Sequence, residues 1–316
     1  MAELMHQETL AKIRNHLSEL FHKDGKIFVL IDNLDKSWKK NNKLAIQSEW
    51  ILGLLSVTEK IVKDLSSFRV KGQQKRIDFH LTIFLRSDIF RYILDWAREA
   101  DKVEYTNLLH LGDREVLFRI IEQRFVELSN DQPLPENLWN KYIIRTVDEV
   151  PVKDYIYDKL VPRPRDMIYL LKNALENAIS RGHIIIDEED LKLAFSNYSA
   201  WVVTSMMVEN GITLDQLKEF LYKLVGEPQI IDREILYLVM SDMNLSQSEE
   251  NLDKLLDKLI EHLSTLSIIG KEVSKDDFEF EYAFDSKDII NAKSKKLGSN
   301  RYKIHNALVP YLNLNS

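Results

Sequence analysis

The sequence has 316 residues, enough for one large domain or two ordinary ones, and 45% apolar with 29% charged residues is a globular composition. With 50 acidic against 43 basic residues there is no general attraction to nucleic acid or an anionic membrane, so any such contact must be local. Cysteine is absent, which excludes disulfides, thiolate metal sites and thiol nucleophiles. No apolar run approaches the ~20 residues of a membrane span, and we expect a soluble, cytoplasmic protein without membrane contact.

The first third of the chain alternates between helical and strand patterns. Helical spacing predicts a helix over 7–21, followed by a strand over 27–31. A second helix is expected over 43–65, and "RIDFHLTIFL" (76–85) predicts a second strand. A weaker pattern at 105–111 suggests an edge strand. Strands separated by helices are typical of a parallel sheet buried on both faces.

The rest of the chain is mostly helical. Helical patterns cover 113–128, 136–146, 153–160 and 164–181, and then, from about residue 211, 213–225, 231–241 and 249–266. Two short strand patterns follow, "FEFEYAF" and "RYKIH", and three helices before a β-hairpin are the order of a winged helix. We therefore expect a predominantly helical protein with a partial α/β core, an all-helical lid and a C-terminal winged helix, divided as 1–112, 113–210 and 211–316.

Acidic residues follow the first predicted strand directly. In "KIFVLIDNLDKSW", Asp32 and Asp35 come after apolar residues, and ligands of open α/β sheets collect at the carboxyl ends of strands. A hydrophobic strand ending on Asp32 is a Walker B arrangement, because Mg²⁺ needs rigidly held oxygen ligands. Asp35 would polarise a water or orient a partner. The alternative is that both acids only cap the next helix.

The second strand also ends on polar groups. "TIFLRSDIF" places Arg86 and Ser87 after the strand, where a nucleotide switch has a polar sensor that touches the γ-phosphate or the attacking water. The alternative is an Arg86 that pairs with Asp88 or Asp32.

Several segments together carry a family resemblance. "FVLIDNLDKSW", "IFLRSDIF", "LFRIIEQRF", "VPRPRDMIYLLKNALENAISRG", "AFSNYS" and "YKIHNALVPYL" occur in this order. The chain thereby resembles, from about residue 7 to its end, the Sll1717 group of bacterial P-loop ATPases, which are related to the STAND, KAP and origin-recognition branches of the AAA-type ATPases.

The resemblance implies an ATP-driven switch with Mg²⁺ as cofactor, in which Asp32 is the metal-site acid, Asp35 the second acid and Arg86 the sensor. It further implies that Arg165, or in its place Arg163, reports on the phosphates from the lid, and that Arg124 reaches a neighbouring subunit of a homo-oligomer. Such ATPases often act beside an effector protein in bacterial anti-phage defence.

The sequence departs from the family in one respect. A P-loop requires GxxxxGK[ST], because glycine amides surround the β-phosphate and a lysine neutralises it, and this motif does not occur. The chain also begins just before the Walker B strand, so we expect the C-terminal portion of a longer ATPase, or a split member whose partner supplies the loop. Alone, the chain is expected to be inactive as an ATPase.

The charge of the predicted winged helix argues against binding of its third helix in the major groove of DNA. Its third helix, "SEENLDKLLDKLIEHL", carries five acids and two lysines, which a phosphate backbone would repel. A basic cluster follows at Lys287, Lys293, Lys295, Lys296, Arg301 and Lys303, so contact of the wing with DNA stays an alternative to a solvated loop. The rival function is accordingly a non-enzymatic interaction or regulatory protein that has lost nucleotide chemistry.

The histidines do not indicate zinc, because they show no paired spacing such as HExxH. The stretch 181–190 predicts the end of one helix and the start of another, which Asp187 caps.

Overall fold

A computed structural model gives two compact units, residues 1–108 and 109–316, and each is described by itself. The structure describes residues 26–34, 44–70, 73–86, 113–128, 135–209, 214–243, 249–282 and 286–315, together with single positions between 9 and 21, between 89 and 93, and at 107 and 109. Among the helices so described, none is long and apolar enough to cross a membrane.

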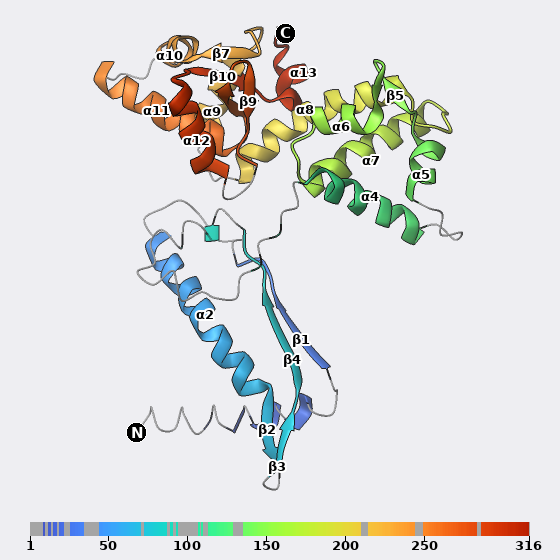
Figure 1. The fold of residues 1–316 in the computed structure, drawn as a ribbon, viewed down its shortest axis with the longest axis vertical. Coiled ribbons are helices and arrows are strands. Elements are labelled where there is room, and N and C mark those ends of the chain that lie inside the picture. The colour runs from blue at the N-terminus through green and yellow to red at the C-terminus, as the bar shows by residue number, and fades with distance from the viewer. Residues whose placement is uncertain are drawn as a thin grey trace. The chain divides into compact units, whose positions relative to one another are not determined.

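The first unit contains a parallel pair of strands beside a long helix (Figure 1). Strand β1 (Lys26–Ile31) pairs with β4 (Asp78–Ile83) over its whole length, from Lys26 opposite Asp78 to Ile31 opposite Ile83. Between them in the chain come α2 (Leu44–Leu65) and a hairpin of β2 (Ser67–Val70) and β3 (Gln73–Arg76). Both predicted strands, their parallel pairing and the intervening helix are confirmed.

Described residues cover only one face of the parallel strand pair. Phe79 of β4 is buried and stacks on Phe21 at 5.9 Å between ring centroids. Side chains of β1 alternate between half-buried and exposed, and Phe28 and Leu30 are 59% and 63% exposed. The expectation of a sheet buried on both faces is therefore wrong for the described part, which supplies two strands and no layer over Phe28 and Leu30.

The second unit begins with helices around a common core. Their bounds, and those of a short hairpin that precedes α6, are α4 (Arg114–Leu128), α5 (Pro135–Tyr142), β5 (Thr146–Val147), β6 (Val150–Pro151), α6 (Val152–Lys159), α7 (Pro164–Ser180) and α8 (Glu188–Glu209). Helix α7 starts with proline at its first position, where the missing N–H costs nothing, and buries Met167, Leu170 and Ala174 at helical spacing.

The C-terminal part of this unit combines helices with an antiparallel sheet. Its elements are α9 (Leu214–Lys223), β7 (Ile230–Asp232), α10 (Arg233–Ser241), α11 (Glu249–Thr265), β8 (Ile269–Ser274), β9 (Asp277–Glu279), α12 (Ser286–Leu297), β10 (Arg301–Ile304), the 3₁₀ turn η2 (Asn306–Leu308) and α13 (Val309–Leu312). The described strands are ordered β7-β10-β8-β9.

The expected pairing of the two last strands is wrong. β8 pairs with β9 on one side and with β10 on the other, so the segments predicted to form a hairpin are not neighbours. Helix α12 lies between them in the chain, in a stretch expected as a basic loop. The order of three helices and a small sheet agrees with the expectation, while the winged helix itself stays a prediction.

One hydrophobic core runs through the whole second unit. It extends from Leu117 on α4 to Leu308 and Leu312 at the C-terminus, all of them fully buried. The helical part and the C-terminal part therefore pack as one body.

Candidate functional site

The carboxyl ends of β1 and β4 lie side by side. Their parallel register places Ile31 opposite Ile83, and the ladder continues with a hydrogen bond of 2.8 Å from the Phe84 N–H to the Ile31 carbonyl. Asp32 follows β1 directly, and Arg86 follows β4 by three residues. Both are exposed, at the same end of the same pair of strands.

The backbone turns sharply just after Asp32. Asn33 has a positive φ of 60°, a left-handed conformation that asparagine tolerates better than most residues. Its N–H donates a hydrogen bond of 2.7 Å to Oδ1 of Asp32. This bond orients the carboxylate at the end of the strand.

Arg86 stands at the start of the next helical segment. Its carbonyl accepts a hydrogen bond of 2.9 Å from the N–H of Phe90. Below it, Ile89 and Ile93 are almost fully buried against Ile51 of α2 in a small separate core. The backbone that carries Arg86 is thus anchored by packing while its side chain is exposed.

The remaining predicted site residues fall into two groups. Asp35 and Ser87 lie outside the described residues. Arg124 is exposed on α4, and Arg163 and Arg165 lie at the start of α7, so all three belong to the second unit. The structure therefore brings Asp32 and Arg86 to one edge of the first unit, and Arg124, Arg163 and Arg165 belong to the second unit.

Arg163 and Arg165 differ in their surroundings. Arg165 is 51% exposed, and its Nε lies 3.9 Å from Oδ2 of Asp166. Arg163 is the N-cap residue of α7. Burial raises the pKa of Asp166 and lowers that of the buried His305, and the positive charge of Arg163 opposes the first shift and reinforces the second. Arg165 is thus the more accessible of the two for a ligand, whereas Arg163 faces groups inside the second unit.

A buried carboxylate and tyrosine behind these arginines are absent from the sequence predictions. The hydroxyl of Tyr198 donates a hydrogen bond of 2.9 Å to Oδ1 of Asp166 and accepts one of 3.0 Å from the Val161 N–H. Burial raises the pKa of Asp166, against the opposing charge of Arg163 and the bond from Tyr198. The pair ties the loop before α7 to the middle of α8.

The carboxylate of Asp166 has one further unusual feature. It is 1% exposed, and its Oδ2 accepts no hydrogen bond within the described part of the chain, although the Arg165 guanidinium lies 3.9 Å away. The sequence gives one signal for Asp166, which is its place in the first turn of a helix predicted to begin at Pro164, where acidic side chains are favourable.

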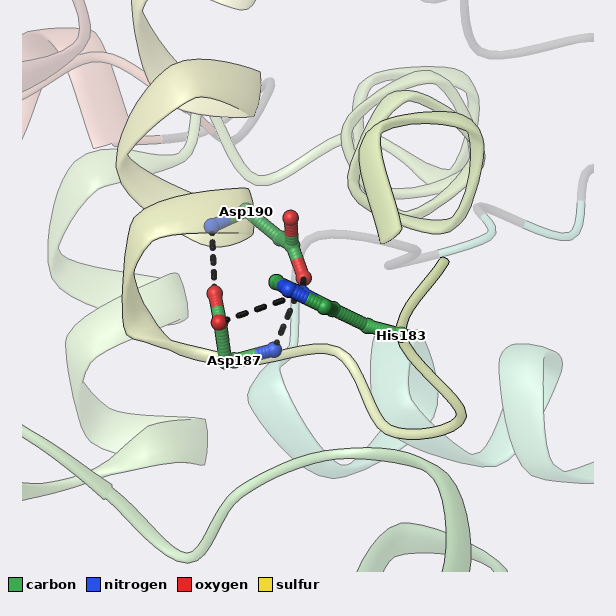
Figure 2. Close-up of side chains that lie close together, drawn as sticks. All are labelled: His183, Asp187 and Asp190. Carbon is green, nitrogen blue, oxygen red and sulfur yellow. Dashed lines mark hydrogen bonds and ion pairs between the residues drawn. The ribbon is translucent and has the colours of Figure 1, made fainter. Parts of the chain in front are cut away.

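In the described part of the chain, the side chains of His183, Asp187 and Asp190 lie close enough together to hold a metal ion (Figure 2). Nδ1 of His183 lies 2.9 Å from Oδ2 of Asp190 and 3.2 Å from Oδ2 of Asp187. Burial acts to raise the pKa of Asp190, but hydrogen bonds from His183 and from the Asp187 N–H outweigh it and lower the pKa.

This group has a structural explanation. Asp187 accepts a hydrogen bond of 2.8 Å from the Asp190 N–H, and Asp190 accepts one of 3.1 Å from the Asp187 N–H, which is a reciprocal capping box. The Arg181 guanidinium lies 3.0 Å from Oδ1 of Asp190, where it supplies the positive charge that a cation would bring. The predicted cap at Asp187 is confirmed, and the group stabilises the α7–α8 turn.

Three of the six residues of the basic cluster near the C-terminus are paired with acids. Lys287 pairs with Glu261 at 2.6 Å, Lys293 with Glu279 at 2.6 Å, and Arg301 with Glu272 at 2.7 Å. These residues lie on α12 and β10 rather than on a loop. A phosphate backbone would have to replace these acids, which weakens the case for DNA contact.

Comparisons with known proteins found limited similarity. Residues 115–207, which run from α4 to α8, match a FunZ-associated C-terminal helical domain. Two solved structures of the ORC2 protein of Aeropyrum pernix are similar to 91% and 90% of this chain and 69% and 68% of theirs. The first is an ADPNP–ADP complex with 14% identity and a TM-score of 0.34, and the second an ADP form with 16% and 0.37. The search of curated proteins found no match. The matched helical domain falls within the region 113–210 in which the sequence predicts an all-helical unit.

Proposed function

We propose that this chain supplies the metal side and the γ-phosphate side of the nucleotide site in an AAA- or STAND-like P-loop ATPase switch. The observation that supports this most is the position of Asp32 and Arg86 after the same ends of two adjacent parallel strands. Ligands of parallel α/β sheets bind at this edge.

The residues present fit one end of a Mg²⁺–ATP complex. The Asp32 carboxylate is a hard oxygen ligand suited to Mg²⁺, and the Arg86 guanidinium suits a phosphate group. When bound, Mg²⁺ would neutralise charge on the β- and γ-phosphates. Asp32 would hold this ion, and Arg86 would orient the terminal phosphate, with Asp35 and Ser87 as the neighbouring polar groups.

This chain has no loop to bind the β-phosphate of the nucleotide, because the sequence has no GxxxxGK[ST]. We propose that another segment or a partner chain brings this loop. Two features support additional structure at the sheet. Within the described residues β4 pairs on one edge only, which leaves its other edge for a further strand, and Phe28 and Leu30 expose an apolar face that a further layer could cover. A parallel sheet is normally covered on both faces.

The second unit would report the nucleotide state. Arg165 is the proposed phosphate sensor, since half of its side chain is exposed, and Arg124 is the proposed contact to a neighbouring subunit of a homo-oligomer. Such a switch would pass its state to an effector, and anti-phage defence is the setting that we propose for it.

The test compares two aspartates at opposite ends of the same strand pair. The chain is mixed with a polypeptide that carries GxxxxGK[ST], either from its own gene neighbourhood or as a linked upstream segment, and Mg²⁺-dependent ATP hydrolysis is measured. We expect Asp32→Asn to abolish hydrolysis and Asp78→Asn to leave it unchanged, because Asp78 lies at the amino end of β4. Equal rates for the two variants contradict the proposed role of Asp32.

One observation favours the rival function. Without a P-loop motif, the chain by itself has no means of surrounding a β-phosphate, as expected of a non-enzymatic interaction or regulatory protein. If no P-loop-bearing segment restores ATP binding, as measured by calorimetric titration with Mg²⁺ and ATP, the rival function is supported instead.

A further inference from the structure

We propose that the hairpin of β2 and β3 binds the phosphate backbone of duplex DNA. The chain carries a net charge of −7, yet the segment 67–76, "SFRVKGQQKR", contains four basic residues and no acidic one. The basic residues are Arg69, Lys71, Lys75 and Arg76. On an acidic protein, a local excess of positive charge is the electrostatic footprint of a binding site for a polyanion.

The hairpin lies at the end of the strand pair that is remote from the candidate nucleotide site (Figure 1). Strand β3 ends at Arg76 and β4 begins at Asp78, whereas Asp32 and Arg86 follow the opposite, carboxyl ends of β1 and β4. A strand of this length spans about 20 Å, which is roughly twice the Debye length at 0.1 M salt. The charges at the nucleotide edge therefore have little effect at the hairpin, and DNA binding there does not depend on the proposed ATPase.

The base of the hairpin is fixed to the elements on either side. The Ser66 N–H donates a hydrogen bond of 2.8 Å to the Val62 carbonyl in the last turn of α2, and the Ile77 N–H donates one of 2.8 Å to the Ser66 carbonyl. The side chain of Ile77 is 5% exposed and therefore packs in the interior. A ribbon anchored in this way loses less conformational entropy when a ligand binds than a free loop would.

The register of the hairpin places two arginine positions on one face. Ser67 pairs with Arg76, and Arg69 pairs with Gln74, so the two pairs are two residues apart along each strand. Because successive positions of a strand alternate between the two faces, these four positions share one face. The side-chain amide of Gln74 donates a hydrogen bond of 3.2 Å to Oγ of Ser67 and joins the two pairs. This face therefore combines two arginines with two smaller polar residues.

The acids that flank the hairpin in the sequence leave most of its charge uncompensated. After the hairpin, Oδ1 of Asp78 lies 2.7 Å from Nε2 of His80, and its Oδ2 lies 3.6 Å from Nζ of Lys26. Arg76 is exposed and forms no ion pair with any residue that the structure describes. Before the hairpin, Asp64 can offset one positive charge at most. At least three of the four basic residues therefore remain for an external anion.

These features favour duplex DNA over other polyanions. A two-stranded ribbon fits the major groove of B-DNA but not the deep, narrow major groove of RNA helices, and arginine, glutamine and serine all contact phosphates. Proteins that bind single strands stack the bases on aromatic side chains, whereas the one aromatic residue in 67–76, Phe68, pairs with Lys75 on the other face. A membrane surface requires apolar residues that insert, and "KGQQKR" (71–76) contains none.

The experiment is a titration of the full chain into a fluorescein-labelled DNA duplex of about 20 base pairs, followed by fluorescence anisotropy at 50, 100 and 200 mM NaCl. We expect a dissociation constant on the order of 1–100 µM, and a slope of about −3 for the logarithm of the association constant against that of the salt concentration, as for three to four phosphate contacts. Arg69→Gln/Arg76→Gln should flatten the slope by about 2 and weaken binding at 50 mM NaCl at least about tenfold. Lys71→Gln should flatten it by about 1, and it carries the test if thermal melts show that the double variant does not fold.

The matched control removes the same charge elsewhere. Lys295→Gln/Lys296→Gln changes two exposed lysines of α12 in the C-terminal basic cluster, alters the net charge as much as the double hairpin variant does, and should leave the slope unchanged. The proposal is overturned if the duplex does not bind at 50 mM NaCl with about 100 µM protein, or if the hairpin variants bind like the wild type. It is also overturned if the control loses as much affinity as the hairpin variants, or if a single strand of equal length or phosphatidylserine vesicles bind the hairpin more tightly than the duplex does.

Discussion

His305 makes the stability of the second unit depend on pH. The side chain is 2% exposed. Its Nδ1 accepts a hydrogen bond of 2.9 Å from the Ala307 N–H, and its Nε2 contacts the Tyr282 hydroxyl at 2.5 Å. Burial, reinforced by the charges of Arg163 and Lys303, lowers the pKa of His305 from 6.5 to about 3. The folded protein therefore holds this imidazole neutral.

The sign of the effect follows from proton binding. Between pH 6.5 and 3 the unfolded chain binds a proton at this histidine and the folded chain does not, so stability falls as the pH is lowered through this window. The slope is about 1.4 kcal/mol per pH unit well inside the window, which gives a loss of about 2 kcal/mol between pH 7 and pH 5. Above pH 7 the contribution of His305 is constant.

The assay is urea denaturation followed by circular dichroism at pH 5, 6, 7 and 8. His305→Asn keeps an acceptor for the Ala307 N–H but cannot be protonated, so its unfolding free energy should depend less on pH by the same ~2 kcal/mol between pH 7 and 5. Other titrating groups contribute equally to both proteins and cancel in the difference. Parallel pH profiles for wild type and variant would refute the assignment of a neutral buried imidazole.

Three further predictions follow from the candidate site and its support. Tyr198→Phe leaves two buried groups without a hydrogen-bond partner and should lower the free energy of unfolding by roughly 2–4 kcal/mol in the same urea assay, whereas an unchanged midpoint contradicts this. In the complemented ATPase, Arg86→Ala should reduce the hydrolysis rate without lowering the melting temperature, since the side chain is exposed. Arg165→Ala should weaken the response to ATP, and Arg163→Ala should destabilise the fold more than Arg165→Ala does, because the charge of Arg163 acts more strongly on the buried Asp166; the reverse order of melting temperatures would exchange their roles.

The strands of the first unit were predictable because their pattern is strong. Apolar β-formers run through "IFVLI" and "LTIFL", and the helix between them implies a parallel connection. The hairpin of β2 and β3 was not predicted, since "SFRV" and "QQKR" are short and polar, and their pairing depends on the turn between them. Sequence patterns therefore located the strongly apolar strands and missed the short polar ones.

Helix α12 shows how charge can conceal a helix. "SKDIINAKSKKL" looks like a basic loop, yet ion pairs from Lys287 and Lys293 to acids on other elements stabilise it, and these partners are remote in the sequence. Gly298, with a φ of 70°, ends the helix, and a glycine at this position was a usable C-cap signal.

The same dependence on remote contacts explains why Asp32 and Arg86 were predictable while Asp166 and Tyr198 were not. Asp32 and Arg86 could be predicted to share an edge, because the rule for strand ends needs only local patterns. The hydrogen bonds of Tyr198 with Asp166 and Val161 join residues 32 and 37 positions apart. No local pattern encodes these contacts, and they emerge only once the helices pack.

The most direct test of the central claim is the structure of the complemented ATPase with bound nucleotide and Mg²⁺. The proposed function predicts the ion within about 2.0–2.1 Å of an Asp32 carboxylate oxygen, or one bridging water away, with the Arg86 guanidinium directed at the γ-phosphate. A nucleotide bound away from the carboxyl ends of β1 and β4, with Asp32 and Arg86 both facing solvent, would contradict it.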